Sequence, residues 1–386
     1  MRVIGVVTSA RSDVSYLLPV FEQIAAAPDL ELRLYATGMH LSPEFGLTVE
    51  DLVRRGFAPD ERVEMLLSAD TPSAIAKSMG VGMLGFAQVF ARERPDILLL
   101  LGDRFETFAA AAAMLPFAGP IAHIAGGEVT EGAIDDAFRH ALTKMSHIHF
   151  AATERSARRI VQMGEEPWRV HVTGAPTLDN LHAITLLDRP GLEKLVGLSL
   201  DPRPLLVTLH PATLEAEETV QQAAALLKAL DTLGLPVVFT YPNADTSGRS
   251  IIKAMDDFVV SHSRAVVVRN LGSEGYYSLM HHASAMVGNS SSGIIEAASF
   301  RLPVVDIGSR QRGRERGANV LFSSTDTGSI AEAIGKALSP EFRASLDGLV
   351  NPYGDGRAAQ RIASVLRDVP LDRDLVQKKF HDLELA

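Results

Sequence analysis

The 386-residue sequence contains no cysteine, which excludes a disulfide framework, a thiolate nucleophile and a cysteine-ligated metal. Positive charge is also scarce: 37 Lys and Arg stand against 47 Asp and Glu, and the net charge is −10. Proteins that bind nucleic acid hold its phosphates with clustered Lys and Arg. We therefore expect no nucleic-acid partner, and we expect any anionic ligand to be held by a few local groups.

Long hydrophobic runs are missing as well. The longest apolar stretches, Ile97–Leu101 and Ala109–Leu115, fall far short of the ~18 residues that indicate a membrane span. The apolar run at the N-terminus stops at Thr8, which makes it too short for the core of a signal peptide. Together with the lack of cysteine, these absences favour a soluble, cytoplasmic protein without a membrane partner.

What the sequence does contain is a recurring pattern of short β-branched or Leu-rich runs, each followed by a turn and a longer helical pattern. This alternation is typical of βαβ units with a buried parallel sheet. We expect strands at 3–7, 30–36, 96–101, 121–124, 148–151 and 169–172, and again at 205–209, 237–240, 265–268, 285–287 and 304–307. The sequence therefore predicts the α/β class with two domains.

The boundary between these domains is placed in a hinge around 177–203, which carries Pro-containing segments near its end. We expect an N-terminal domain at 1–177 and a C-terminal domain at 178–357. A tail at about 358–386, with helices at 358–367 and 372–385, can pack back on either domain.

Ligands of doubly wound sheets bind beyond the carboxyl ends of the strands. In the second half, one strand runs into Gly288-Asn-Ser-Ser-Ser-Gly293, and a helix is expected from Ile294. Backbone N–H groups and hydroxyls at Ser290 and Ser291 can hold a diphosphate at the positive end of that helix, and Glu296 can accept bonds from ribose hydroxyls. Ordinary capping by serine is the alternative, but three serines exceed what one cap needs.

Cations for such a diphosphate are expected from Arg11, His210 and Arg310, which all follow predicted strands. For His210 taken alone, a polar residue lining a loop is the alternative. The other arginines of the 310–316 segment are interpreted as a solvated loop.

Carboxylates dominate the strand ends of the first half, where Asp103, Glu128, Asp135 and Asp136 occur. Carboxylates that lie close together or away from water have raised pKa values and can act as general acid and base. Helix capping is the alternative for Asp103 and for the Asp135–Asp136 pair, and composition alone does not decide between the two.

Two further patterns are given a structural interpretation. The glycines at 80, 82 and 85 match the spacing of a dinucleotide-binding turn, but they follow a helical pattern that opens with Thr71-Pro72 rather than a strand. His140, His147 and His149 lack a zinc-ligand spacing, so we expect no metal site.

The strand-end motifs, in order, carry a resemblance to a known family. They are Arg11-Ser-Asp13, Gly102-Asp-Arg-Phe-Glu106, the segment His123–His140, Gly288–Gly293, Gly308-Ser-Arg310 and Tyr353-Gly-Asp-Gly356. This series resembles the UDP-N-acetylglucosamine 2-epimerase family, and most closely its hydrolysing branch, which serves sialic-acid and legionaminic-acid biosynthesis.

The resemblance implies a glycosyltransferase-B-like fold: two Rossmann-like domains facing a cleft, with a C-terminal helix returning to the N-terminal domain. It also implies the reaction. A base removes the proton at C2 while UDP leaves from C1, and water adds to the resulting 2-acetamidoglycal to release a free sugar with inverted C2. A UDP-sugar substrate, no cofactor, no metal and a homo-oligomer (dimer or tetramer) are expected on the same ground.

Site residues follow from the resemblance position by position. Asp103 and Asp135 match the catalytic carboxylates, and Glu128 and His210 join them as catalytic candidates. The expected substrate and UDP contacts are Arg11, Ser15, Arg104, Asn243, Ser290, Ser291, Glu296 and Arg310.

The sequence departs from the family pattern at Ala125, where many members have Glu. This shifts acid–base work to Asp103, Glu128 or Asp135. The smaller residue also leaves room near the sugar, so we expect a 4-acetamido-4,6-dideoxy variant of UDP-N-acetylglucosamine to be accepted. The choice between this sugar and UDP-N-acetylglucosamine itself stays open, and the free product is N-acetylmannosamine or its 4-acetamido-4,6-dideoxy analogue. The segment Val14-Ser15-Tyr16 lacks the Lys of the non-hydrolysing branch, and this favours the hydrolysing one.

Three alternatives stay open at this point. They are a non-hydrolysing 2-epimerase, a glycosyltransferase on the same scaffold, and a nucleotide-sugar-binding protein without catalysis.

Overall fold

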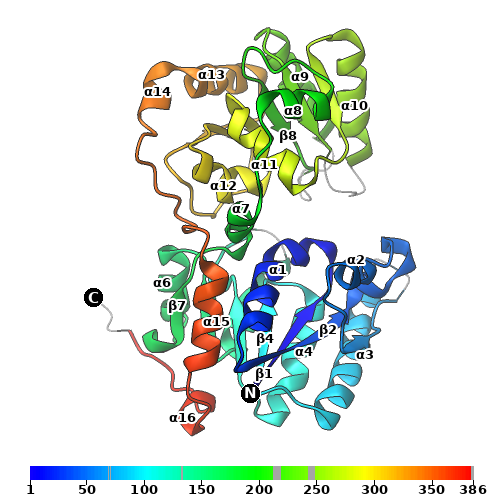
Figure 1. The fold of residues 1–386 in the computed structure, drawn as a ribbon, viewed down its shortest axis with the longest axis vertical. Helices are drawn as coiled ribbons and strands as arrows, with labels where there is room; N and C mark the ends of the chain where they lie inside the picture. The colour runs from blue at the N-terminus through cyan, green and yellow to red at the C-terminus, as the bar shows by residue number, and fades with distance from the viewer. Residues whose placement is uncertain (68, 70, 132–133, 212–218, 242–247, 384–386) are drawn as a thin grey trace. The chain divides into compact units, whose positions relative to one another are not determined.

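A computed structural model describes residues 1–67, 69, 71–131, 134–211, 219–241 and 248–383. The chain divides into two compact units, Met1–Asn180 with Tyr353–Ala386 and Leu181–Pro352, and each unit has its own parallel sheet (Figure 1). The expected α/β class with two Rossmann-like domains is confirmed.

The first unit contains a seven-stranded sheet in the order β3-β2-β1-β4-β5-β6-β7. Its strands are β1 (Arg2–Thr8), β2 (Leu30–Thr37), β3 (Glu61–Val63), β4 (Ile97–Leu101), β5 (Ile121–Ile124), β6 (Ile148–Ala151) and β7 (Val170–Val172). The strand order reverses between β1 and β4, where the chain turns from one side of the sheet to the other. Such a switch point opens a space for ligands beyond the strand ends.

Helices cover both faces of this sheet. They are α1 (Arg11–Ala26), α2 (Val49–Arg54), α3 (Pro72–Arg92), α4 (Phe105–Met114), α5 (Ile134–Met145), α6 (Glu154–Gln162), α15 (Ala358–Asp368) and α16 (Arg373–Val376). A short helix α7 (Asn180–Ala183) begins where the first unit ends.

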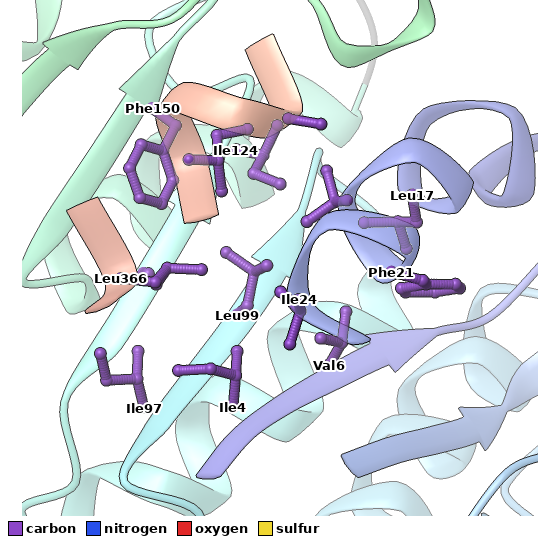
Figure 2. Close-up of a cluster of buried hydrophobic side chains, with 14 of the residues drawn as sticks. Ile4, Val6, Leu17, Phe21, Ile24, Ile97, Leu99, Ile124, Phe150 and Leu366 are labelled. Carbon is purple, nitrogen blue, oxygen red and sulfur yellow. The ribbon is translucent and has the colours of Figure 1, made fainter. Parts of the chain in front are cut away.

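One core cluster of the first unit joins the two ends of the chain. Figure 2 shows Ile4 and Leu99 of the sheet, Leu17 and Phe21 of α1 and Leu366 of α15, which all belong to this cluster. All five side chains are fully buried. The C-terminal helix therefore returns to the N-terminal domain, as the family resemblance implied.

The tail beyond α15 differs from its prediction, because the expected helix at 372–385 is reduced to α16, and 377–383 are not helical. Arg169 explains the early end: its guanidinium donates to the carbonyls of Asp374 and Leu375, both at 2.7 Å. Its Nη1 also donates to the carbonyl of His147. These carbonyls would otherwise accept bonds from a continuing helix.

Helix α3 contains the three spaced glycines. The Thr71 hydroxyl accepts a hydrogen bond from the Ala74 N–H, and Pro72 occupies the first turn, so the glycines lie inside a helix as expected. By length and composition α3 is the one helix of the described residues that can cross a membrane, and a third of its most apolar window is buried. In this structure it packs against α4 and β3.

The second unit has a six-stranded parallel sheet in the order β10-β9-β8-β11-β12-β13. Its strands are β8 (Leu205–Thr208), β9 (Val237–Thr240), β10 (Ala265–Val268), β11 (Ala285–Gly288), β12 (Val304–Ile307) and β13 (Val320–Ser323). Its helices are α8 (Arg189–Val196), α9 (Thr219–Asp231), α10 (Gly248–Ser261), α11 (Gly272–His282), α12 (Ser291–Ile295), α13 (Thr327–Leu338) and α14 (Pro340–Ala344).

Candidate active site

Asp103 lies in the first unit just past the end of β4, where Gly102 takes a left-handed conformation. Its carboxylate forms an ion pair with the guanidinium of Arg139 on α5. Arg104 rather than Asp103 occupies the N-cap position of α4. Asp103 is therefore held by a buried cation and is not the N-cap of α4.

Arg139 itself is only 4% exposed and holds two more groups. Its Nη1 lies 3.0 Å from Thr130 Oγ1 and 3.5 Å from Asp136 Oδ1. Asp136 also accepts a bond from the Thr130 N–H at 2.8 Å, which ties the first turn of α5 to the preceding loop. Sequence reasoning missed Arg139, although its position three residues after Asp136 in a helix is a recognisable signal.

Arg104 and Asp135 are a second pair of residues whose charges interact. Arg104 pairs with the fully buried Glu106 through Nε at 3.2 Å and Nη2 at 2.9 Å. Burial raises the pKa of Asp135, and the nearby charge of Arg104 opposes that shift. This carboxyl therefore keeps its proton to a higher pH than an exposed aspartate does.

The loop after β5 has a strained backbone at the position where the sequence departs from the family pattern. Ala125 has φ of +64°, and its N–H donates to the carbonyl of Phe150 at 3.0 Å. Two residues on, Gly127 comes so close to Ser156 that a Cβ would collide with its carbonyl oxygen. Glu128 follows and is half-buried.

His123, just before that loop, connects it to the Asp103 turn. The His123 Nε2 lies 2.7 Å from the carbonyl oxygen of Gly102. Burial lowers the pKa of His123 to about 4, so the ring is neutral at neutral pH and Nε2 donates this bond.

Arg11 and Ser15 lie in the first two turns of α1, and both are exposed. Between them, Asp13 accepts bonds from the N–H groups of Ser9 at 2.8 Å and Ala10 at 3.0 Å. Because these two N–H groups already donate to Asp13, they are not offered to a ligand. The guanidinium of Arg11 remains the predicted phosphate contact here.

In the second unit, the serine loop differs in detail from its prediction. Helix α12 begins at Ser291 rather than at Ile294, because Ser290 is its N-cap and accepts a bond from the Ser292 N–H at 3.4 Å. Glu296 is the C-cap that follows the last residue of this short helix, Ile295, rather than a residue one turn into a longer helix, and it is 8% exposed. Ser290 thus caps the helix, and its hydroxyl also faces a pocket.

This pocket has a volume of about 240 Å³ and lies beyond the carboxyl ends of β8, β9 and β11. Its lining includes the side chains of Thr208, His210, Tyr276 and Ser290. The Tyr276 hydroxyl interacts with those of Ser292, Thr208 and Ser290, while burial raises the pKa of Tyr276 to about 12. The result is a small chamber lined by hydroxyl groups.

His210 and Arg310 are joined through Asn289. The Nη1 of Arg310 donates to the Asn289 carbonyl at 3.0 Å, and the Asn289 side chain bonds the backbone of His210. Burial, with the charge of Arg310, lowers the pKa of His210 to about 4. Asn243, the remaining predicted contact, lies outside the described residues.

The three histidines discounted as metal ligands have separate partners. His140 lies 3.4 Å from Asp136, His149 lies 3.0 Å from Glu165, and His147 accepts from the Ile121 N–H. Over the part of the chain that the structure describes, no group of three or more His, Asp or Glu is placed to hold a metal ion.

Comparisons with known proteins bear on this arrangement. The family model described as UDP-N-acetylglucosamine 2-epimerase matches residues 22–367. The chain belongs to this family. It is 38% identical to the GDP/UDP-N,N'-diacetylbacillosamine 2-epimerase (hydrolyzing) of Campylobacter jejuni, with 99% of each chain covered. It is 34% identical to the UDP-N,N'-diacetylbacillosamine 2-epimerase (hydrolyzing) of Legionella pneumophila, with 98% of this chain and 99% of the relative covered.

A solved structure agrees in fold. The UDP-GlcNAc 2-epimerase of Neisseria meningitidis, in complex with UDP-GlcNAc, superimposes with a TM-score of 0.80 at 19% identity, covering 95% of this chain and 99% of that one. The expected family, the hydrolysing type of 2-epimerase and the enzymatic function are confirmed by the relatives.

Proposed function

We propose that this 2-epimerase hydrolyses UDP-N,N'-diacetylbacillosamine to UDP and the free 2,4-diacetamido-2,4,6-trideoxy sugar of manno configuration. The names of the two relatives at 38% and 34% identity support this substrate. Ala125 supports it too, because a methyl group stands where many family members have a longer carboxylate side chain. The product is suited to the biosynthesis of sialic- or legionaminic-acid-type sugars.

The observation that carries the chemistry is the contrast between two carboxyl groups of the first unit. Asp103 is paired with the buried Arg139, which favours its ionised form, whereas burial raises the pKa of Asp135. Two groups whose environments push their protonation in opposite directions can divide base and acid work.

In the proposed reaction, Asp103 removes the proton from C2 while the bond between C1 and the diphosphate oxygen breaks. The electron pair of the C2–H bond forms the C1–C2 double bond of the glycal. Water then adds its hydroxyl to C1, and Asp135 donates a proton to C2 on the opposite face, so that C2 is inverted. The proton that this water loses restores Asp135, and Asp103 releases the abstracted C2 proton to solvent. Glu128 stays a second candidate for either role.

The residues of the second unit serve the leaving group in this proposal. The chamber beside Ser290 accepts the nucleotide, Ser290 and Ser291 contact the diphosphate, and Glu296 contacts the ribose. His210 and Arg310 offset the charge that develops on UDP. Arg11, which belongs to the first unit, remains a predicted phosphate contact. Ser15, Arg104 and Asn243 remain predicted substrate contacts.

The test is proton NMR of the protein with UDP-N,N'-diacetylbacillosamine and, separately, with UDP-N-acetylglucosamine in D2O. The proposal expects the free manno-configured sugar with deuterium at C2, together with UDP, from the first substrate. Turnover of UDP-N-acetylglucosamine alone would move the assignment to the unmodified sugar, which the 32% identical Neisseria meningitidis relative is named for. UDP binding without turnover of either sugar would contradict the proposed reaction.

The remaining expectations are proposals of the same kind: a cytoplasmic location, no nucleic-acid or membrane partner, and a homo-oligomer. The last is supported by helix α3, whose Val81, Met83 and Leu84 are 40%, 39% and 69% exposed. Apolar side chains gathered on one exposed helix are typical of a surface that packs against another chain.

A further inference from the structure

Asn289, which immediately follows β11, is 2% exposed and bonds the ends of two other strands. Its side-chain Oδ1 accepts from the His210 N–H at 2.7 Å, and its Nδ2 donates to the His210 carbonyl at 2.8 Å. The side chain therefore satisfies both backbone polar groups of His210, as a paired strand would do.

The main chain of Asn289 makes the other connections. Its carbonyl accepts from Arg310 Nη1 at 3.0 Å and from Gln311 Nε2 at 2.8 Å, and its N–H donates to the Thr208 carbonyl at 3.1 Å. One residue thus bonds to the loops that follow β8 and β12, the neighbours of β11 on either side.

Gly288 makes this close approach possible. Its φ is +138°, and a Cβ there would collide with the carbonyl oxygen of Thr208. Because no side chain separates the ends of β8 and β11, the amide of Asn289 reaches the His210 backbone directly.

We propose that Asn289 is a positioning residue that fixes His210 and Arg310 relative to each other so that both face the diphosphate of the substrate. This inference rests on the proposed function, since it takes the second unit to bind UDP. Because the N–H and the carbonyl of His210 are both bonded, its backbone is fixed. Only the χ1 and χ2 torsions of the side chain then set the direction of the ring. Arg310 is fixed through the carbonyl of the same residue, so the spacing of His210 and Arg310 does not depend on the ligand.

The test compares the affinities of the full-length protein for UDP and for uridine, measured by calorimetry and by NMR titration. Asn289→Ala removes both side-chain bonds, and Asn289→Asp keeps the acceptor for the His210 N–H while losing the donor to its carbonyl. We expect both variants to bind UDP about tenfold to a hundredfold more weakly, because His210 is no longer held in place and its contact with the charged diphosphate is lost. Uridine, which has no phosphate, should bind with affinity within about threefold of wild type.

Asn319→Ala is the matched control. Asn319 is fully buried in the same unit and donates to the Leu302 carbonyl at 2.8 Å, so its loss lowers stability. The control should keep the UDP affinity of the wild type. Turnover adds a second measure: a positioning role predicts a lower kcat for the Asn289 variants at saturating substrate, since the leaving diphosphate is stabilised less well.

Unchanged UDP affinity in both Asn289 variants would overturn the inference, as would an equal loss of uridine and UDP affinity, which is the sign of a collapsed pocket. The two proposals fail differently. If the wild type binds no UDP, the proposed function falls and the inference with it. If the wild type binds UDP and the Asn289 variants bind it equally well, only the inference falls.

Discussion

Replacing Arg139 with alanine is expected to reduce turnover far more than it reduces stability. Breaking a fully buried ion pair by removing one partner costs about 3–5 kcal/mol. Here the side chains of Asp103 and Asp136 are 23% and 26% exposed, so solvent screens the two negative charges that remain without Arg139. We therefore expect a loss of about 2 kcal/mol in the free energy of unfolding, measured by urea denaturation.

The effect on turnover follows from the freedom that Asp103 gains. Without the guanidinium, the carboxylate can rotate away from the substrate, and a displacement of ~1 Å costs about a hundredfold in rate. We expect kcat for UDP release to fall by about that factor, with little change in UDP affinity. Arg139→Lys retains the charge without the forked geometry and should give an intermediate rate.

Arg169→Ala provides the control. Arg169 is 1% exposed in the same unit, and it bonds Glu166 and the carbonyls of the tail, away from Asp103. Its loss should lower stability by a similar amount and leave the turnover of folded protein unchanged. A near-wild-type kcat in Arg139→Ala, or a loss of turnover in proportion to stability in both variants, would refute this role of Arg139.

Three further predictions concern ionisable groups. Asp103→Asn should abolish exchange of the C2 proton with D2O, whereas Asp135→Asn should allow UDP release but slow formation of the manno product; equal, near-full turnover in both would refute the division of roles. UDP binding should be accompanied by proton uptake, because the pKa of His210, about 4 in the free protein through burial and the charge of Arg310, rises beside a diphosphate. UDP affinity should then increase as the pH falls from the pKa of the bound state toward 4, and calorimetry in buffers of different ionisation enthalpy should show an uptake that His210→Asn removes. Although burial opposes it, hydrogen bonds from His149 and two lysines lower the pKa of Glu165 to about 2, so its stabilising contribution is complete above about pH 4.5 and is lost as the pH falls toward 2. Glu165→Gln should therefore lower the melting temperature at pH 7 and make no difference near pH 2; a deficit that is independent of pH would contradict this.

The strands could be predicted because buried parallel strands have continuous apolar runs. β4 is Ile-Leu-Leu-Leu-Leu with four of its five residues buried, and such a run has few other interpretations. β3 and β13 were missed because they are short strands at the edges of their sheets, where few side chains are buried. The pairing of an edge strand is decided by its neighbour rather than by its own sequence.

Some candidate site residues could be predicted from the sequence, because they follow strands that the sequence also predicts. Asp103 and Ser290 could be named because each comes soon after an apolar strand, and Asp135 because the order of the motifs matched a family. The contacts among them could not be named in this way. The pairing of Asp103 with Arg139 and the bonds from Asn289 to His210 join residues 36 and 79 positions apart, and only the folded chain brings them together.

The left-handed backbone at Ala125 is a different case. Alanine gives no local signal for positive φ, which favours glycine or asparagine. The conformation is imposed by the fixed loop around Gly127, so sequence reasoning identified the unusual residue without its geometry.

The return of the tail to the first unit has a consequence for synthesis of the chain. Leu366 and Leu375 belong to the first unit's core, and Lys378 reaches the buried Glu165 at 2.7 Å. A ribosome must therefore translate the whole second unit before the first can be completed, and until then Glu165 lacks one of its cations and part of the β1–β4 face lacks its cover. Domains usually fold in the order in which they emerge. Here the first unit begins to emerge before the second but can complete its fold only after the second has been synthesised. The second unit can therefore fold before the first is complete.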